Sequence, residues 1–306
     1  MELKVQSVVK SFGEKEVLKN ISFSAQSGKA LGLLGRNGAG KTTTIRIIMG
    51  VFLPDSGEVL IDGKPIDRDS FQIGYLPEER GLYPKKIITE QLMYLATLRG
   101  LSKKEAKDAC DHWLERMGMS EYKNKKLETL SKGNQQKIQL AATLMCNPKL
   151  VILDEPFSGL DPVNAMLLKD VIKEMIDGGA IVIFSSHQMN YIEEFCDSIA
   201  ILNGGNIVLN GRISEIKRQY PRNTIAITSN QCDKISSFVI QQTADCIESA
   251  NISDDEENTV IIKLKKPEYK NRIMTQLANN GFDIDCFKVC EPSLNDIFVE
   301  YTEDGI

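Results

Sequence analysis

Residues 29–50, KALGLLGRNGAGKTTTIRIIMG, decide the fold of this chain. They open with a short apolar run, pass through a glycine-rich segment, and close with apolar residues at helical spacing (Ile45, Ile48 and Met49). This order predicts a strand, a tight loop and a helix. The loop, GRNGAGKT at 35–42, matches the pattern G-x-x-x-x-G-K-[ST], whose glycines let backbone N–H groups turn inward around phosphates. The segment therefore predicts a phosphate-binding loop.

Each part of this loop has a predicted role. Lys41 is expected to reach the β- and γ-phosphates of a nucleotide, and Thr42 to offer a hydroxyl to Mg²⁺. The helix that begins near residue 41 directs its positive end at the anion. A glycine-rich turn with an exposed lysine is the alternative, but the preceding strand and following helix favour the functional interpretation. The expected nucleotide contacts here are Gly35, Arg36, Asn37, Gly38, Ala39, Gly40, Lys41, Thr42 and Thr43.

Two further apolar runs end in side chains suited to catalysis. The run LVILDEP (150–156) ends in Asp154 and Glu155, and GAIVIFSSH (179–187) ends in His187. A helical pattern separates them, so they predict a β-α-β unit with both carboxyl ends at one edge of a parallel sheet. Asp154 is expected to hold Mg²⁺ through water, Glu155 to polarise the attacking water, and His187 to contact the γ-phosphate.

Composition limits the class of protein. With 306 residues the chain has room for one large or two medium domains, and its net charge of −5 argues against a nucleic-acid partner. The seven cysteines form no C-x-x-C pair, which favours reduced thiols, as in the cytosol, over a zinc site or a disulfide framework. No signal-peptide core and no run of about 18 apolar residues is present, so a partner must supply any membrane span.

The charge balance changes near residue 220. Residues 221–306 carry 8 basic and 15 acidic side chains, whereas the preceding residues are nearly balanced. Strand-like and helix-like segments also alternate differently in this tail. The sequence predicts a nucleotide-binding domain over 1–220 and a small α+β domain over 221–306, with a ferredoxin-like sandwich as the expected form.

Taken in order, the motifs over residues 2–220 resemble those of the nucleotide-binding subunits of ABC transporters. GRNGAGKTT resembles the Walker A loop, LVILDEP the Walker B strand, LSKGNQQK (130–137) the ABC signature, SGLD (158–161) the D-loop, and His187 the switch histidine. The resemblance implies an α/β P-loop ABC ATPase domain, with a RecA-like core, an antiparallel β subdomain and a helical subdomain, followed by the small α+β domain. It also implies ATP and Mg²⁺ as cofactors.

The resemblance further implies a dimer in which two subunits enclose two ATP molecules head to tail. The signature of one subunit then caps the γ-phosphate held by the other: Ser131 offers a hydroxyl, Gly133 a backbone N–H, and the following helix its positive end. A simple helix cap is the alternative for Ser131, and the two roles are compatible. Asp161 in the D-loop completes this set. Phe12 matches the aromatic position that stacks on adenine, with a strand-edge core residue as its alternative.

Three positions in two motifs depart from the family pattern. The signature has Lys132 where a glycine is usual and Asn134 where a glutamine is usual. The glutamine of the Q-loop corresponds to Glu78, whose carboxylate is expected to reach Mg²⁺. Glu79 is the alternative for this position, and a single sequence leaves the choice open.

A narrower resemblance, in YLPEERGLY, LSKGNQQK and the tail EPSLNDIFVEYT, is to bacterial exporter subunits of the sodium-extrusion and antibiotic self-protection class. It implies a separately encoded transmembrane permease bound through residues 84–146, a second ATPase subunit, and a peripheral location at the cytoplasmic face of the membrane. A homodimer is expected. A soluble ABC ATPase acting on ribosomes or DNA, and a non-hydrolysing regulatory subunit, remain as alternatives. The sequence does not indicate the cargo.

Overall fold

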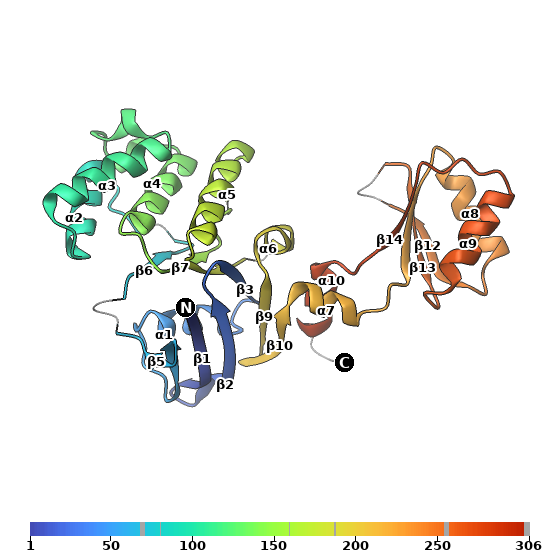
Figure 1. Ribbon diagram of the computed structural model, residues 1–306, viewed down its shortest axis with the longest axis horizontal. Helices are drawn as coiled ribbons and strands as arrows, with labels where there is room; N and C mark the ends of the chain where they lie inside the picture. Colours follow the sequence, from blue (N-terminus) through green and yellow to red (C-terminus); the bar gives the residue numbers. More distant parts are fainter. Residues whose placement is uncertain (68–70, 80, 159, 187, 254–256, 303–306) are drawn as a thin grey trace. The chain divides into compact units, whose positions relative to one another are not determined.

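The computed structural model describes residues 1–67, 71–79, 81–158, 160–186, 188–253 and 257–302. The chain divides into two compact units, one formed by Met1–Ile213 with Phe298–Ile306 and the other by Ser214–Ile297. The sequence-based boundary, between 1–220 and 221–306, stays a prediction. Figure 1 shows the elements of each unit.

The first unit contains an antiparallel sheet at its N-terminus. Its order is β2-β1-β4-β5. Alternating side chains of β1, such as Leu3 and Val5, are buried, as expected for a sheet with one face on the core. The four strands are β1 (Glu2–Phe12), β2 (Lys15–Gln26), β4 (Ser56–Ile61) and β5 (Lys64–Pro65).

A second, six-stranded sheet forms the centre of this unit, in the order β10-β9-β3-β8-β7-β6. All neighbouring strands are parallel except β10, which pairs antiparallel with β9. The strands are β3 (Lys29–Gly35), β6 (Ile73–Leu76), β7 (Leu150–Asp154), β8 (Ile181–Ser185), β9 (Ser198–Asn203) and β10 (Asn206–Arg212). The predicted parallel sheet is confirmed, and it brings the ends of β3, β7 and β8 to one edge.

Helix α1 (Lys41–Ile48) packs in the core that joins the two sheets. Ile45 and Ile48 of α1 share this core with Leu33 of β3, Ile152 of β7 and Val5 of β1. The apolar residues whose spacing predicted the helix are therefore the ones that pack in this core, directly after the loop that follows β3. Burial of this continuous apolar cluster holds the loop on a rigid support.

Three helices form a separate group, the helical subdomain: α2 (Ile88–Leu98), α3 (Lys103–Arg116) and α4 (Lys132–Leu144). They lie beside one another in Figure 1. Two further helices of the first unit are α5 (Pro162–Asp177), between β7 and β8, and α6 (Met189–Phe195). Helix α7 (Ile213–Gln219) begins at the unit boundary and belongs to the second unit from Ser214 on. Within the described residues, no helix has both the length and the apolar character needed to cross a membrane.

The second unit has the order β-α-β-β-α-β and one antiparallel sheet, β12-β13-β11-β14. Helices α8 and α9 cover one face of this sheet (Figure 1), and Ile235, Val239, Ile273 and Leu277 on them are buried. This arrangement is the ferredoxin-like sandwich expected from the sequence. Its elements are β11 (Thr224–Thr228), α8 (Cys232–Gln242), β12 (Ile247–Ile252), β13 (Thr259–Leu264), α9 (Tyr269–Asn279) and β14 (Cys286–Cys290).

The last helix, α10 (Leu294–Thr302), ends within the first unit. The side-chain amide of Asn203, at the end of β9, donates a hydrogen bond of 3.1 Å to the carbonyl of Tyr301. The side chain of Thr302 is buried and donates to the carbonyl of Phe298 at 2.7 Å. Residues 298–302 are thus part of the first unit, although the rest of α10 belongs to the second.

Candidate functional site

The predicted phosphate-binding loop connects β3, which ends at Gly35, to α1, which begins at Lys41. Gly40 caps α1 with φ +115, and a Cβ atom at this residue would lie 2.6 Å from the Cδ2 atom of Leu18. Only glycine satisfies both the backbone conformation and the close packing here. Arg36, Asn37 and Gly38 are exposed, so the tip of the loop is open to a ligand.

Lys41 lies folded across the loop. Its Nζ donates hydrogen bonds to the carbonyls of Gly35 at 2.6 Å and Arg36 at 3.3 Å. Burial lowers the pKa of Lys41, while the negative charges of Asp154, Glu155 and Glu78 act on it in the opposite direction. The ammonium group is therefore held by two neutral acceptors that an anionic phosphate can replace with a stronger, charge-assisted bond.

Asp154 ends β7 at the same edge of the sheet, in register with Ser185 of β8. Burial raises the pKa of Asp154, and the charges of Glu155 and Glu78 act in the same direction. The Tyr75 hydroxyl on β6 donates to the Oδ2 atom of Asp154 at 3.5 Å, and burial raises the pKa of Tyr75 to about 12. Negative charge is thus concentrated here, and the charge of Lys41 partly offsets its effect on Asp154.

This excess of negative charge fits a divalent cation at Asp154. Among the residues that the structure describes, however, no group of three histidine, cysteine or carboxylate side chains is arranged to hold a metal ion. Mg²⁺ usually takes most of its ligands from phosphate and water oxygens, so it does not need such a group. Thr42, Asp154 and Glu78 stay the predicted protein ligands.

Glu155 follows β7 with an unusual backbone. Its φ of +48 is left-handed, which is strained for a residue other than glycine. Two hydrogen bonds hold it: its N–H donates to the carbonyl of Ser185 at 2.8 Å, and the Ser186 hydroxyl donates to its Oε2 atom at 3.0 Å. The strand β8 thereby fixes the direction of the carboxylate. His187, the next residue after Ser186, lies outside the described residues.

The signature segment opens helix α4. Ser131 is its N-cap, and the hydroxyl accepts a hydrogen bond of 3.3 Å from the N–H of Asn134. The capping role considered for Ser131 is therefore present in the single chain, and it leaves the hydroxyl at the exposed end of the helix. Asp161 caps α5 in the same way, and the N–H of Asn164 lowers the pKa of its carboxylate.

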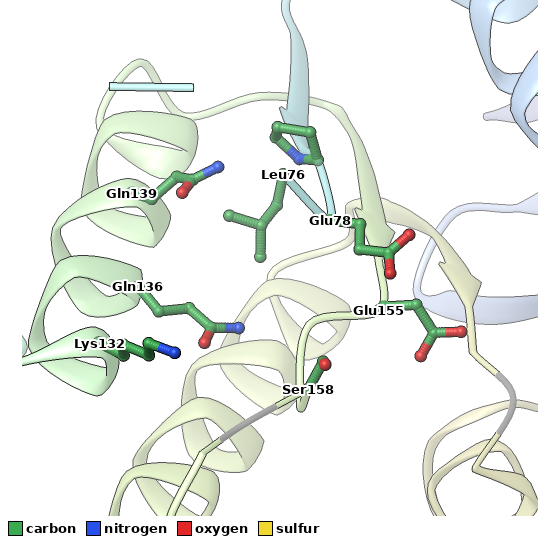
Figure 2. Close-up of a pocket in the computed structure, with 8 residues that line it drawn as sticks. Leu76, Glu78, Lys132, Gln136, Gln139, Glu155 and Ser158 are labelled. Carbon is green, nitrogen blue, oxygen red and sulfur yellow. The ribbon is translucent and has the colours of Figure 1, made fainter. Parts of the chain in front are cut away.

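Two of the three residues that depart from the family pattern, Glu78 and Lys132, line one pocket. Figure 2 shows Glu78 and Lys132 on its walls, together with Glu155 and Ser158. The pocket has a volume of about 250 Å³ and is also lined by Leu76, Pro77, Gln136 and Gln139. Lys132 projects into this pocket of its own chain, across from the carboxylate-bearing segments.

The structure distinguishes the two glutamates considered for the Q-loop position. The Glu78 side chain lines the pocket, and its charge acts on both Lys41 and Asp154. The Glu79 carbonyl instead accepts a hydrogen bond of 3.2 Å from the Gln139 amide of α4. Glu78 thus faces the catalytic edge, while Glu79 ties the loop to the helical subdomain.

Phe12 lies at the end of β1 with 45% of its surface exposed. Its ring meets that of Phe52 edge-on, with 5.3 Å between centroids, and the Lys10 ammonium lies 5.4 Å from its centroid. The aromatic surface is therefore accessible, as base stacking requires.

Sequence reasoning missed four residues that contact the site: Tyr75, Gln136, Asn164 and Ser186. Ser186 lies directly before His187 in the run GAIVIFSSH, so the sequence contained a signal that could have identified it. The contact of Tyr75 with Asp154 depends on the pairing of β6 with β7, which nothing in the sequence specifies.

Comparisons with known proteins agree with the geometry. A family model described as ABC transporter matches residues 18–158, and one described as the C-terminal domain of DrrA1-3-like ATP-binding proteins matches residues 211–302. The uncharacterized ABC transporter ATP-binding protein YhaQ of Bacillus subtilis is 40% identical over 97% of both chains. The linearmycin resistance ATP-binding protein LnrL of the same organism is 30% identical over 98% of both. A solved ATP-binding subunit of an ABC transporter matches with TM-score 0.66 and 31% identity, covering 72% of this chain and 93% of that one.

Proposed function

The chain belongs to the ABC transporter family as an ATP-binding subunit, and from this premise we propose that it hydrolyses ATP as a dimer and so drives a separately encoded membrane permease. The observation that carries the proposal is that the phosphate-binding loop and the acidic side chains lie at one edge of the sheet. The charges of Asp154, Glu155 and Glu78 all act on Lys41, the residue that opens helix α1 behind the glycine-rich loop. A nucleotide on that loop has its terminal phosphate beside these carboxylates.

In the proposed reaction, Lys41 exchanges the carbonyls of Gly35 and Arg36 for the phosphates of ATP. Thr42, Asp154 and Glu78 would hold Mg²⁺, which when bound would stabilise the charge on the phosphate oxygens as a Lewis acid. Glu155 accepts a proton from the attacking water; the Ser186 hydroxyl donates to its carboxylate, and the Ser185 carbonyl holds its backbone N–H. His187 is proposed to contact the γ-phosphate.

A second copy of the chain completes each site in this proposal. Its Ser131 hydroxyl and the positive end of its α4 cap the γ-phosphate, and its Asp161 lies at the same interface. Phe12 stacks on the adenine. ATP binding then closes the dimer, and hydrolysis reopens it. The binding energy of ATP thereby becomes a motion that a permease can follow.

We predict that the turnover of the purified chain with ATP and Mg²⁺ rises per subunit with protein concentration, because a complete site needs two copies. The measurement is phosphate release over a concentration series. A rate that does not depend on concentration would exclude sites shared between freely pairing copies. An absence of turnover at every concentration would favour the non-hydrolysing alternative, and association with ribosomes instead of membranes would favour the soluble one.

The helical subdomain offers a groove for the permease. Tyr83, Lys86, Glu90, Gln91 and Tyr94 line a mostly apolar hollow of about 330 Å³. Tyr83 and Tyr94 expose 59% and 56% of their surfaces, and the Tyr83 N–H is held by the Gln91 side chain at 3.1 Å. Exposed tyrosines on a fixed support are typical of binding hot spots. We propose that a cytoplasmic segment of the permease docks here, close to Glu78 in sequence.

Replacing both Tyr83 and Tyr94 with serine is expected to weaken binding of the permease by at least about 30-fold, which is the effect of losing one hot-spot tyrosine worth about 2 kcal/mol. The measurement is co-purification with the permease from detergent-solubilised membranes. Leu53→Ser is the matched control, because Leu53 is 75% exposed and lies outside the groove. Unchanged co-purification of the double variant would place the permease elsewhere.

Export as the direction of transport and a peripheral location at the cytoplasmic face of the membrane are parts of the same proposal. They are supported by the likeness over 98% of the chain to LnrL, whose name records linearmycin resistance. ATP-dependent accumulation of cargo in inverted membrane vesicles that carry the assembled transporter would support export. Accumulation in right-side-out vesicles would contradict it.

A further inference from the structure

We propose that Asn164 is a positioning residue for the signature segment of its own chain, and that the closeness of its side-chain amide is the reason residue 133 is a glycine. The inference rests on the proposed function in one respect, since it takes the signature segment as the part that caps the phosphate. The signature segment is predicted to act on the nucleotide of a second chain, and the inference adds a contact that this segment makes within its own chain.

The contact is unusually close. A Cβ atom built on Gly133 would lie 2.8 Å from the Nδ2 atom of Asn164 and 3.7 Å from its Cγ atom. The next nearest atom, Oδ2 of Asp161, would be 3.8 Å away, an ordinary van der Waals distance. Asn164 therefore occupies the place that a side chain at position 133 would need.

Asn164 cannot easily move aside, because Asp161 holds it at two points. Its N–H donates to the Oδ1 atom of Asp161 at 2.9 Å, and its side-chain amide donates to the Oδ2 atom at 2.5 Å. Both residues belong to the N-terminus of α5, where Asp161 is the cap. The amide that faces Gly133 is thus part of a fixed capping structure.

A second contact joins the same two parts of the chain. The side-chain amide of Gln136, one turn further along α4, donates to the carbonyl of Pro156. The first two turns of α4 are therefore contacted at two places, by Pro156 directly after Glu155 and by Asn164 at the start of α5. The position of the signature segment is tied to the segment that carries the catalytic carboxylate of the same chain.

The direction of the missing side chain separates two explanations for the glycine. If residue 133 must be small so that a phosphate can approach its N–H, removing Asn164 changes nothing. In this structure all three nearest neighbours of the added Cβ atom belong to Asn164 and Asp161. Contact within the chain is therefore sufficient by itself to constrain residue 133, and that explanation predicts rescue.

The test compares Gly133→Ala, Asn164→Ala and the double variant by steady-state turnover. Gly133→Ala is expected to lower kcat about 10- to 100-fold, because an overpacked contact displaces the signature segment. Asn164→Ala, which only loses the support, is expected to lower kcat about threefold. The double variant is expected to match Asn164→Ala, since the added methyl group then has room.

Gly133→Ala combined with Asn206→Ala is the matched control, because it removes the same atoms from an exposed asparagine on β10 that is not among the close neighbours of residue 133. This pair is expected to stay as slow as Gly133→Ala. ATP binding to the monomer and the thermal unfolding temperature are measured for every variant. A change in kcat with both unaltered is the result expected of a positioning role.

A double variant that stays as slow as Gly133→Ala, while folding and binding ATP normally, would overturn the inference. Failure of the proposed function looks different. In that case the unmodified chain shows no turnover, or Ser131→Arg leaves its turnover intact. The two failures are therefore distinguished by variants measured in the same series.

Discussion

Glu155→Gln is expected to lower ATP turnover by about 100-fold or more, the effect that removal of a general base typically has. The glutamine side chain keeps the size of glutamate and can still accept the hydrogen bond that Ser186 donates at 3.0 Å. It cannot take up the proton of the attacking water. ATP binding is expected to persist, because Glu155 is not part of the glycine-rich loop, so the ATP-bound dimer should accumulate.

The measurements are phosphate release and size-exclusion chromatography in the presence of ATP and Mg²⁺. Glu194→Gln is the matched control: Glu194 pairs with Lys169 at 2.7 Å on the surface, away from the site. It is expected to hydrolyse ATP like the unmodified chain. Turnover of Glu155→Gln near the unmodified rate would show that another group accepts the proton.

Ser131→Arg is expected to abolish turnover in the dimer, because its long side chain enters the position proposed for the γ-phosphate of the partner's ATP. Loss of a helix cap alone is a smaller effect of about 1 kcal/mol in stability. Ser102→Arg provides the control, since Ser102 caps α3 with the same 3.3 Å hydrogen bond that Ser131 makes in α4. It is expected to cost stability without abolishing turnover.

A mixing experiment tests whether Ser131 acts on the partner's site. A trace of unmodified chain is combined, before ATP is added, with a large excess of Glu155→Gln chain. Only the trace chain can then hydrolyse ATP, and its sites are completed by the signature of the excess chain. Ser131→Arg in the excess chain should remove this activity. If activity persists there and is lost only when Ser131→Arg is placed in the trace chain, the signature acts within its own subunit.

Long periodic segments were predicted well because their patterns reflect burial on one face. The strand, loop and helix of 29–50 became β3, the phosphate-binding loop and α1, and the β-α-β unit became β7, α5 and β8. Short elements were missed. Strand β12 (Ile247–Ile252) buries only two of its six side chains, so its alternation is weak, and β6 (Ile73–Leu76) has four residues. Pairing partners rather than local pattern define such strands.

The sequence by itself determined the residues of the motifs, their order and the chemistry each side chain can perform. Lys41, Asp154 and Glu155 could be named because glycine spacing and apolar runs ending in carboxylates are local signals. Only the tertiary structure showed that Glu78 and Lys132 line one pocket and that Asn164 fills the space beside Gly133. These contacts join segments that are far apart in the chain. Their geometry depends on how the elements pack against one another, and such packing leaves no repeating pattern of residues in the sequence.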